Sequence, residues 1–206
     1  MRIDTENEKR KRGRPRQFDP ERVLENVRAV FIAKGYAGAS LDDLAAAAGL
    51  NRPSLYGAFG DKEQLYIQTL KQLGRRSLTR LGEALARAEP IEERLTAIYR
   101  SAIASYSAPP LHAGCMIVNT AATAATTHPA IAEAAREIRV DTEAMFERAF
   151  AACVARRELP PEPAPSARAK LATAMLDTLA VRARLGESAQ SLEAFAQEAL
   201  ALVCVI

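Results

Sequence analysis

The chain has few of the residues on which enzymes and redox proteins depend. Its 206 residues include only two histidines, His112 and His128, and neither belongs to a recognisable acid–base, nucleophile or phosphate-loop pattern. The three cysteines, Cys115, Cys153 and Cys204, are widely spaced and odd in number, which is typical of reduced or buried thiols and not of a disulfide framework. We therefore expect a protein that is not an enzyme and that needs no cofactor.

Long apolar runs are also missing. No stretch is long and apolar enough to span a membrane, and the first twenty residues are too charged and polar for a signal peptide. From Asp61 onward no alternating strand pattern occurs, and Ala, Leu, Arg and Glu dominate between the turn signals. We therefore expect an all-α protein without a membrane partner, located in the cytoplasm and associated with the nucleoid.

The positive charge is distributed unevenly along the chain. Residues 1–60 hold 11 Lys and Arg against 8 Asp and Glu, whereas residues 61–206 hold 17 of each. All of the net charge of +3 therefore lies in the N-terminal part. Such asymmetry indicates a nucleic-acid partner, because cationic side chains neutralise phosphates and release the counterions condensed on them.

Most of this charge lies in residues 9–16, which hold six basic side chains and no acidic one. The segment Arg12–Pro15 (RGRP) resembles the core of an AT-hook, whose extended backbone places arginines in the narrow minor groove of A/T-rich DNA. We predict that residues 1–17 form a disordered basic arm that contacts the groove or its phosphates. The contacting residues are expected to be Arg12, Arg14 and Arg16. A tail that only keeps the protein soluble is the alternative.

Three short helices and the start of a fourth can be placed between residues 18 and 61 from the signals at their ends. A side chain that accepts hydrogen bonds from the first free amides precedes each helix, and a glycine follows each of the first three. The predicted caps are Asp19, Ser40, Asn51 and Asp61, and the terminating glycines are Gly35, Gly49 and Gly60. The second and third helices, joined by a tight turn, have the layout of a DNA-reading helix-turn-helix.

The third helix is predicted to be the recognition helix. Leu55 and Phe59 lie four residues apart and are expected to pack inward. The residues left to face outward are Arg52, Ser54, Gly57 and Ala58. Because most of these side chains are small, the backbone can approach a groove of DNA closely.

An ordered series of residues between Phe18 and about Leu70 forms a specific pattern. It comprises Gly35-Tyr36, Ser40-Leu41-x-x-Leu44-Ala45, Gly49, Ser54-Leu55-Tyr56, Phe59 and Lys62-Glu63-x-Leu65. This series resembles the tetracycline-repressor (TetR) family of bacterial transcriptional regulators. The resemblance implies a ligand-responsive repressor that binds a palindromic operator as a homodimer and is released by a small-molecule effector. A purely structural bundle of capped helices is the alternative.

The resemblance also implies the division of the chain and the residues that contact double-stranded DNA. The helix-turn-helix domain would span residues 18–61, and the ligand-binding and dimerisation domain would span residues 62–206. Arg52 is predicted to read a base, because its planar guanidinium can donate to O6 and N7 of guanine; a non-specific phosphate contact is the alternative. Phosphate contacts are expected from Ser40, Tyr56 and Lys62, and close or apolar contacts from Pro53, Ser54 and Gly57.

Six further helices are expected after residue 61, giving about nine in all. They run from Lys62 toward Ala88, from Pro90 to Pro109, over Cys115–Ala122, from Pro129 to about Glu158, and roughly over Ser166–Leu185 and Ser191–Val205. The segment Cys115–Ala122 is apolar almost all round and is therefore expected to be buried. His128 is expected to cap the helix that Pro129 begins.

By the same resemblance, the larger domain encloses an effector pocket and pairs with a second copy through its last two helices. The candidate pocket residues are Tyr99, Ile103, Tyr106, Cys115, Asn119 and Phe146, each of which has plain core as its alternative. The candidate dimer residues are Leu171, Met175, Leu179, Leu192, Phe195, Ala199 and Val203.

Three other classes of function remain open beside an effector-controlled regulator. A metal site could draw on His112, Cys115 and His128, although these residues form no compact ligand motif and we predict no metal. Cys115 could act as a redox switch if its surroundings lowered its pKa. An architectural DNA binder would need only the basic arm and the helix-turn-helix, and would leave the larger domain unexplained.

Overall fold

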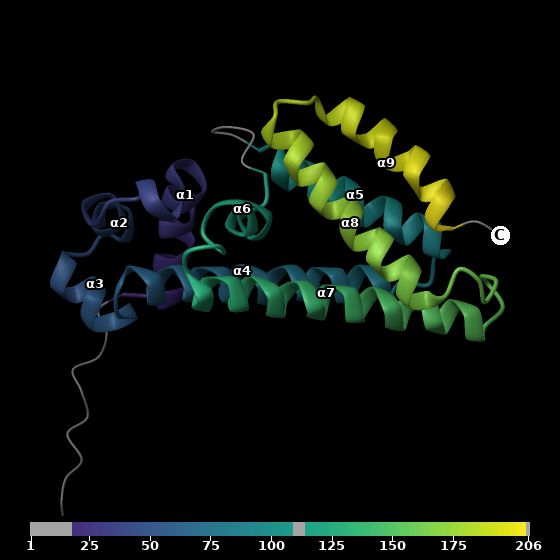
Figure 1. Ribbon diagram of the computed structural model, residues 1–206, viewed down its shortest axis with the longest axis horizontal. Coiled ribbons are helices and arrows are strands. Elements are labelled where there is room, and N and C mark those ends of the chain that lie inside the picture. Colours follow the sequence, from purple (N-terminus) through teal and green to yellow (C-terminus); the bar gives the residue numbers. More distant parts are fainter. Residues whose placement is uncertain (1–17, 109–113, 205–206) are drawn as a thin grey trace, which may run out of the picture.

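The computed structural model describes residues 18–108 and 114–204, which form nine α-helices and no strand (Figure 1). The helices are α1 (Pro20–Gly38), α2 (Leu41–Ala48), α3 (Arg52–Phe59), α4 (Lys62–Leu85), α5 (Ile91–Tyr106), α6 (Met116–Thr123), α7 (Pro129–Ala155), α8 (Pro165–Arg184) and α9 (Ala189–Val203). The prediction of an all-α fold of about nine helices is confirmed. None of the described helices combines the length and the apolar character that a membrane span requires.

Two long helices organise the molecule. Figure 1 shows α4 and α7 side by side, with α1, α2 and α3 gathered at one end of the pair. Toward the other end, α5, α8 and α9 pack on one another and cover one side of α4 and α7. The short helix α6 lies between the two groups and contacts α1, α7 and α8.

The predicted caps begin the first four helices. Asp19 accepts a hydrogen bond from the Glu21 amide, Asn51 from the Ser54 amide and Asp61 from the Gln64 amide. Each cap satisfies an amide that lacks a partner within its own helix. The cap of α2 is Ser40, and the glycines that follow α2 and α3, Gly49 and Gly60, have positive φ angles of 65° and 81°.

Several predicted helix ends differ from the structure by a few residues. The first helix resumes for one turn after Gly35 leaves helical geometry with φ of 69°, and so ends at Gly38. The fourth helix ends at Leu85: the Ala86 amide still bonds to the Gly82 carbonyl, but the next amide, of Arg87, bonds to the carbonyl of Ala84, three residues back. The seventh ends at Ala155, shortly before Arg157 adopts a left-handed φ of 60°.

Two local expectations are corrected. Within α6 the side chains of Met116 and Thr120 are buried, but Ile117 is only half-buried, because the helix packs against its neighbours on part of its circumference. His128 occupies the N-cap position of α7 without forming a side-chain cap, since its Nδ1 lies 2.8 Å from the Thr127 hydroxyl instead.

The buried apolar residues form two clusters that share α4. One cluster fills the larger part and includes Leu81 and Leu85 from the second half of α4. The other joins α1, α2 and α3 to Leu65, Tyr66 and Leu70 in its first half, and also takes in residues of α6 and α7. A buried hydrogen bond of 2.8 Å between the hydroxyls of Tyr66 and Thr120 links α4 to α6. Helices α1, α2 and α3, which we call the recognition unit, are therefore packed directly onto α4. The same helix continues into the larger part, formed by α4 to α9.

The crossing of α4 and α7 depends on Gly74. A Cβ atom at this position would lie 2.7 Å from Ile138 Cγ1, which is closer than packed carbon atoms normally come. We expect Gly74→Ala to lower the free energy of unfolding by about 1–3 kcal/mol, because the two helices must move apart. Urea unfolding followed by circular dichroism measures this change.

Gly82 on the same helix provides a matched control. Its added Cβ would meet only Met145 Cε, at 2.9 Å, and this terminal atom belongs to a flexible side chain that can turn aside. Gly82→Ala is therefore expected to leave stability unchanged or to raise it by up to about 1 kcal/mol through helix propensity. Equal losses for both variants would contradict the close crossing at Gly74.

Candidate nucleic-acid interface

The N-termini of α2 and α3 form an exposed corner. The Ser40 hydroxyl oxygen accepts a hydrogen bond from the Asp43 amide at 3.1 Å, and the Ser40 amide donates to Asp43 Oδ2 at 3.1 Å, so the two residues form a reciprocal cap. Lys34 Nζ lies 2.7 Å from the other oxygen of Asp43. Together these contacts, Lys34 first, lower the pKa of Asp43 to about 2, so the carboxylate stays ionised and the cap intact at neutral pH.

An ion pair that was not predicted joins α2 to α3 at this corner. Arg52 Nε donates to Asp42 Oδ1 at 2.7 Å, and its Nη2 donates to Asp42 Oδ2. The hydrogen bond from Arg52 lowers the pKa of Asp42. Because these residues lie ten positions apart, no local sequence signal shows that they meet.

The outer face of α3 has the character that the sequence predicted. Leu55 and Phe59 are buried against the other helices, whereas Ser54 and Gly57 are exposed. A Cβ atom added to Gly57 would meet nothing within 4 Å. Arg52, Pro53 and Tyr56 are likewise exposed, and Ala58 is half-buried. Around Ser54 and Gly57 the outer face of α3 therefore carries only short side chains, so a large partner can approach the helix backbone closely.

Lys62 lies behind this surface, beside Tyr36. Its Nζ is 3.4 Å from the Ala37 carbonyl oxygen and 4.8 Å from the centre of the Tyr36 ring, and burial lowers its pKa. The Tyr36 ring in turn meets Tyr66 and His128 edge-on, at centroid distances of 5.1 and 4.5 Å. Lys62 therefore helps to hold the end of α1 against α4, in addition to any contact with DNA.

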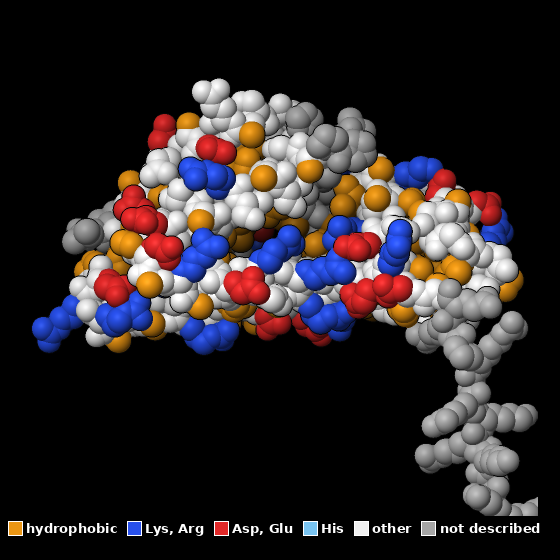
Figure 2. Space-filling model, turned by 180° about the vertical axis from the view of Figure 1, so that it is seen from behind, with side chains coloured by type: hydrophobic (Ala, Val, Ile, Leu, Met, Phe, Trp, Pro, Cys, Tyr) orange, Lys and Arg blue, Asp and Glu red, His pale blue; other side chains and the backbone are white. Residues whose placement is uncertain are grey.

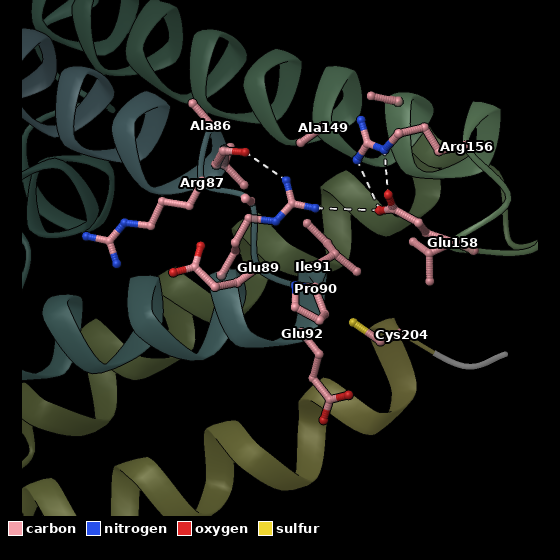
Figure 3. Close-up of a pocket in the computed structure, with 15 residues that line it drawn as sticks. Ala86, Arg87, Glu89, Pro90, Ile91, Glu92, Ala149, Arg156, Glu158 and Cys204 are labelled. Carbon is pink, nitrogen blue, oxygen red and sulfur yellow. Dashed lines mark hydrogen bonds and ion pairs between the residues drawn. The ribbon is translucent and has the colours of Figure 1, made fainter.

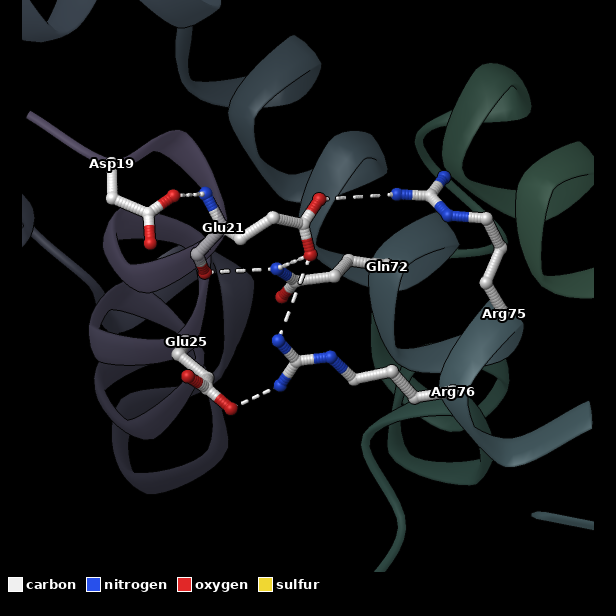
Figure 4. Close-up of polar contacts among 6 residues, drawn as sticks. All are labelled: Asp19, Glu21, Glu25, Gln72, Arg75 and Arg76. Carbon is white, nitrogen blue, oxygen red and sulfur yellow. Dashed lines mark hydrogen bonds and ion pairs between the residues drawn. The ribbon is translucent and has the colours of Figure 1, made fainter. Parts of the chain in front are cut away.

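Polar contacts fix the start of α1 on α4, as Figure 4 shows. The Gln72 amide nitrogen donates to the Glu21 backbone oxygen at 2.8 Å and to the Glu21 carboxylate at 2.6 Å. Arg75 and Arg76 also pair with Glu21, and Arg76 reaches Glu25 (Figure 4). These contacts hold the recognition unit in a defined orientation on α4.

The predicted arm residues Arg12, Arg14 and Arg16, and also His112, lie outside the described residues.

The predicted effector residues fall into two groups. Tyr99, Ile103 and Phe146 are almost completely buried in the core of the larger part. Tyr106, Cys115 and Asn119 are half-buried where the end of α5 faces the start of α6. Burial raises the pKa of Cys115, so the thiol is protonated at neutral pH, and burial also raises the pKa of Tyr106.

A cleft of about 680 Å³ (Figure 3) is lined by the end of α4, the start of α5, the end of α7 and Cys204 after α9. In Figure 1 these helix ends lie away from α1, α2 and α3. The lining of the cleft includes Leu85, Ile91, Arg94, Arg156, Glu158 and Cys204, and none of the six predicted effector residues. Figure 3 shows Arg156 and Glu158 pointing toward each other, and Arg156 holds the pKa of Glu158 at about 2. A smaller groove of about 110 Å³ between α5 and α9 is lined in part by Tyr99 and Ile103.

The candidate dimer residues also separate by burial. Leu179, Leu192 and Val203 belong to the core of the chain itself, and Met175, Phe195 and Ala199 are half-buried. Leu171 is exposed, and it begins an apolar face of α8 that continues through Val181 to Leu185, the residue directly after the helix; Val181 and Leu185 are 47% and 82% exposed. Ala174 and Thr178 lie between them at helical spacing and are also exposed. The predicted dimer residues lie mainly on the inward faces of α8 and α9. The two faces of α8 cannot be told apart from the sequence, because both are apolar.

An N-terminal helix-turn-helix carried by the first long helix of a larger all-α part defines a helix-turn-helix DNA-binding protein. Comparison with known families agrees with this architecture. Residues 23–69 match the model described as "Bacterial regulatory proteins, tetR family", and residues 92–199 match "Tetracyclin repressor-like, C-terminal domain". The chain belongs to the TetR family of bacterial transcriptional regulators, and it is a DNA-binding regulator.

Relatives of known role extend the comparison. The chain is 29% identical to the HTH-type transcriptional repressor ComR of Escherichia coli (strain K12), over 94% of this chain and 93% of ComR. It is 32% identical to the repressor BdcR of the same organism, but that match spans 55% of this chain and 58% of BdcR. A cysteine-substituted CifR, a TetR family regulator solved with a 26 bp operator DNA, superposes with a TM-score of 0.82 at 28% identity, over 91% of this chain and 98% of CifR.

Proposed function

We propose that this regulator is a repressor that binds a palindromic operator as a homodimer and leaves it when a small-molecule effector binds. The observation that carries the proposal is the exposed corner of α2 and α3, where small side chains and one arginine face outward over a well-packed core. ComR and BdcR, which are repressors by name, support the direction of regulation. We place its action in the cytoplasm, on the nucleoid.

In this proposal the residues of the corner divide the work of recognition. The hydroxyl of Ser40, the exposed Tyr56 and Lys62 contact phosphates, which fixes the register of the protein on DNA. Arg52 reads a base from the first turn of α3, while Pro53, Ser54 and Gly57 allow the helix to sit deep in the major groove. Arg12, Arg14 and Arg16 follow the neighbouring minor groove.

The balanced charge of the larger part supports our proposal that DNA is contacted only by the N-terminal end of the protein. Figure 2 shows Lys, Arg, Asp and Glu side chains interspersed along one long face of the molecule, without a large area of one sign. Residues 61–206 also hold equal numbers of basic and acidic side chains. Mixed charge of this kind offers little net attraction to phosphates.

We assign pairing with a second copy of the chain to the last two helices, and within them chiefly to the exposed apolar face of α8. A two-fold pair would place two recognition helices in major-groove turns about 34 Å apart. We expect Leu185→Glu to raise the dimer dissociation constant at least about tenfold, because pairing would bury an unpaired charge. Sedimentation velocity over a range of protein concentrations measures it.

Val140 on α7 is the matched control, since it is also apolar and 57% exposed but lies on another helix. Val140→Glu should leave the dissociation constant unchanged. If neither Leu185→Glu nor Val181→Glu weakens the dimer, the α8 face is not the interface.

The effector site is proposed where polar groups meet the core of the larger part. Tyr106, Cys115 and Asn119 supply polar atoms, and Tyr99, Ile103 and Phe146 supply apolar surface. A ligand that binds one dimer geometry better than another shifts the population away from the DNA-binding form. The protonated state of Cys115 favours an organic effector over an oxidant, because the thiolate is the reactive form.

The central experiment is to recover the fragments of the source genome that the full-length protein binds and to sequence them. The expected result is an enriched inverted repeat, with genes beside it whose products point to the effector. Compounds suggested by those genes should raise the unfolding temperature and release the DNA. Binding without any preferred sequence would contradict a specific repressor and would favour an architectural DNA binder.

A further inference from the structure

The ion pair between Asp42 and Arg52 uses one particular edge of the guanidinium. A guanidinium has five N–H donors: one on Nε and two on each terminal nitrogen. Asp42 accepts from Nε and from Nη2, which is the side edge of the group. One donor of Nη1 and the second donor of Nη2 therefore lie parallel along the end edge, away from Asp42, and the other donor of Nη1 lies on the remaining side of the group. This end edge is the one that can donate in parallel to O6 and N7 of guanine.

The position of the pair suits this use. Arg52 is the first residue of α3, and the N-terminal residues of a recognition helix are those that meet base edges. The side chains of Arg52 and Asp42 are 53% and 74% exposed, so the end edge is not enclosed by the protein. A cation at a helix N-terminus is opposed by the helix dipole, and Asp42 offsets this repulsion from the first turn of α2.

The charge of the pair favours a base over a phosphate as the target. A lone arginine attracts phosphates and releases counterions, but a neutral arginine–carboxylate pair loses most of that attraction. The pair instead fixes the orientation of the Arg52 guanidinium, because the carboxylate restricts a side chain with four rotatable torsions to one orientation. An arginine held in this way gains specificity while contributing little non-specific affinity.

We propose that Asp42 is a positioning residue for base recognition: it holds Arg52 by the side edge and directs the end edge to a guanine in the major groove. The proposal rests on the proposed function, since it requires sequence-specific binding to DNA. It names a guanine in each half-site as the partner of Arg52, and it assigns a role in specificity to a residue that need not touch DNA.

The test is selection of preferred sequences from a random duplex DNA library by the full-length protein and three variants. Arg52→Ala should abolish the preference for guanine at one position of each half-site. Asp42→Asn should reduce that same preference about tenfold and leave the other positions unchanged. In the Arg52→Ala background, Asp42→Asn should have no further effect at that position.

Glu63→Gln is the matched control, because Glu63 is the second residue of α4 as Asp42 is the second residue of α2. Both substitutions remove one negative charge near a helix N-terminus. If Asp42 acts only through its charge, both variants will raise affinity for all sequences alike. If Asp42 acts only on stability, its substitution will weaken every position equally and lower the unfolding temperature. Either result overturns the proposal.

The failure of the inference differs from the failure of the proposed function. An inverted repeat selected by the unaltered protein, with its guanine preference unaffected by Asp42→Asn, overturns the inference alone. The absence of any selected sequence for the unaltered protein overturns both.

Discussion

Replacing Arg168 by methionine is expected to lower the free energy of unfolding by about 1.5–3 kcal/mol, the range for losing hydrogen bonds from a charged donor to buried acceptors. The Arg168 side chain is completely buried and donates to backbone oxygens of Pro160, Glu162, Pro163 and Val203. It thereby ties the connector before α8 to the end of α9. Methionine preserves the apolar stem but leaves these oxygens without their donors. Urea unfolding followed by circular dichroism measures the loss.

Lys170→Met is the control for Arg168→Met, since Lys170 is exposed two residues further along α8. Its effect should stay within about 0.5 kcal/mol. Arg168→Lys should also destabilise the protein, because a single ammonium cannot reach oxygens on both segments. A loss below about 1 kcal/mol for Arg168→Met would show that the hydrogen bonds from Arg168 to the connector and to the end of α9 are not needed for stability.

Gly57→Leu is expected to reduce operator affinity about a hundredfold, or roughly 2.8 kcal/mol, while the fold remains stable. The added side chain enters open space in the free protein, and leucine favours a helix more than glycine does. On DNA, the same side chain would keep α3 away from the base edges. Fluorescence anisotropy with a labelled operator measures the affinity, and thermal unfolding confirms the fold.

Gly57→Ala supplies a graded comparison, with a smaller loss of affinity expected from its single methyl group. An unchanged affinity for Gly57→Leu would contradict the placement of this face of α3 against DNA. A loss of affinity accompanied by a lower unfolding temperature would instead indicate a defect in folding.

The beginnings of the N-terminal helices could be predicted because their causes are local. Asp19, Ser40 and Asn51 each cap through an amide two or three residues away, so the sequence holds both partners of the contact. The inward face of α3 was likewise predictable, since Leu55 and Phe59 follow the helical period. The family could be predicted for the same reason, because its sequence pattern combines several local signals, and the family models confirmed it.

Features that depend on distant elements could not be predicted. Asp42 and Arg52 meet only after the turn sets the angle between α2 and α3. Arginine is usually exposed, and Arg168 is buried because the connector before α8 and the end of α9 supply oxygens for its donors. The two apolar faces of α8 look alike in sequence, and only the packing of α5, α7 and α9 determines which one is covered.

The sharing of α4 between two cores has a consequence for how the chain folds. The core beneath the recognition helix is completed by Leu65, Tyr66 and Leu70, which lie in a helix that runs on to Leu85. A fragment that stopped at residue 61 would lack this surface and would expose Phe31, whose ring packs edge-on against Tyr66 at a centroid distance of 4.7 Å. We therefore expect the DNA-reading segment not to fold on its own, and its folding to be coupled to that of the larger domain.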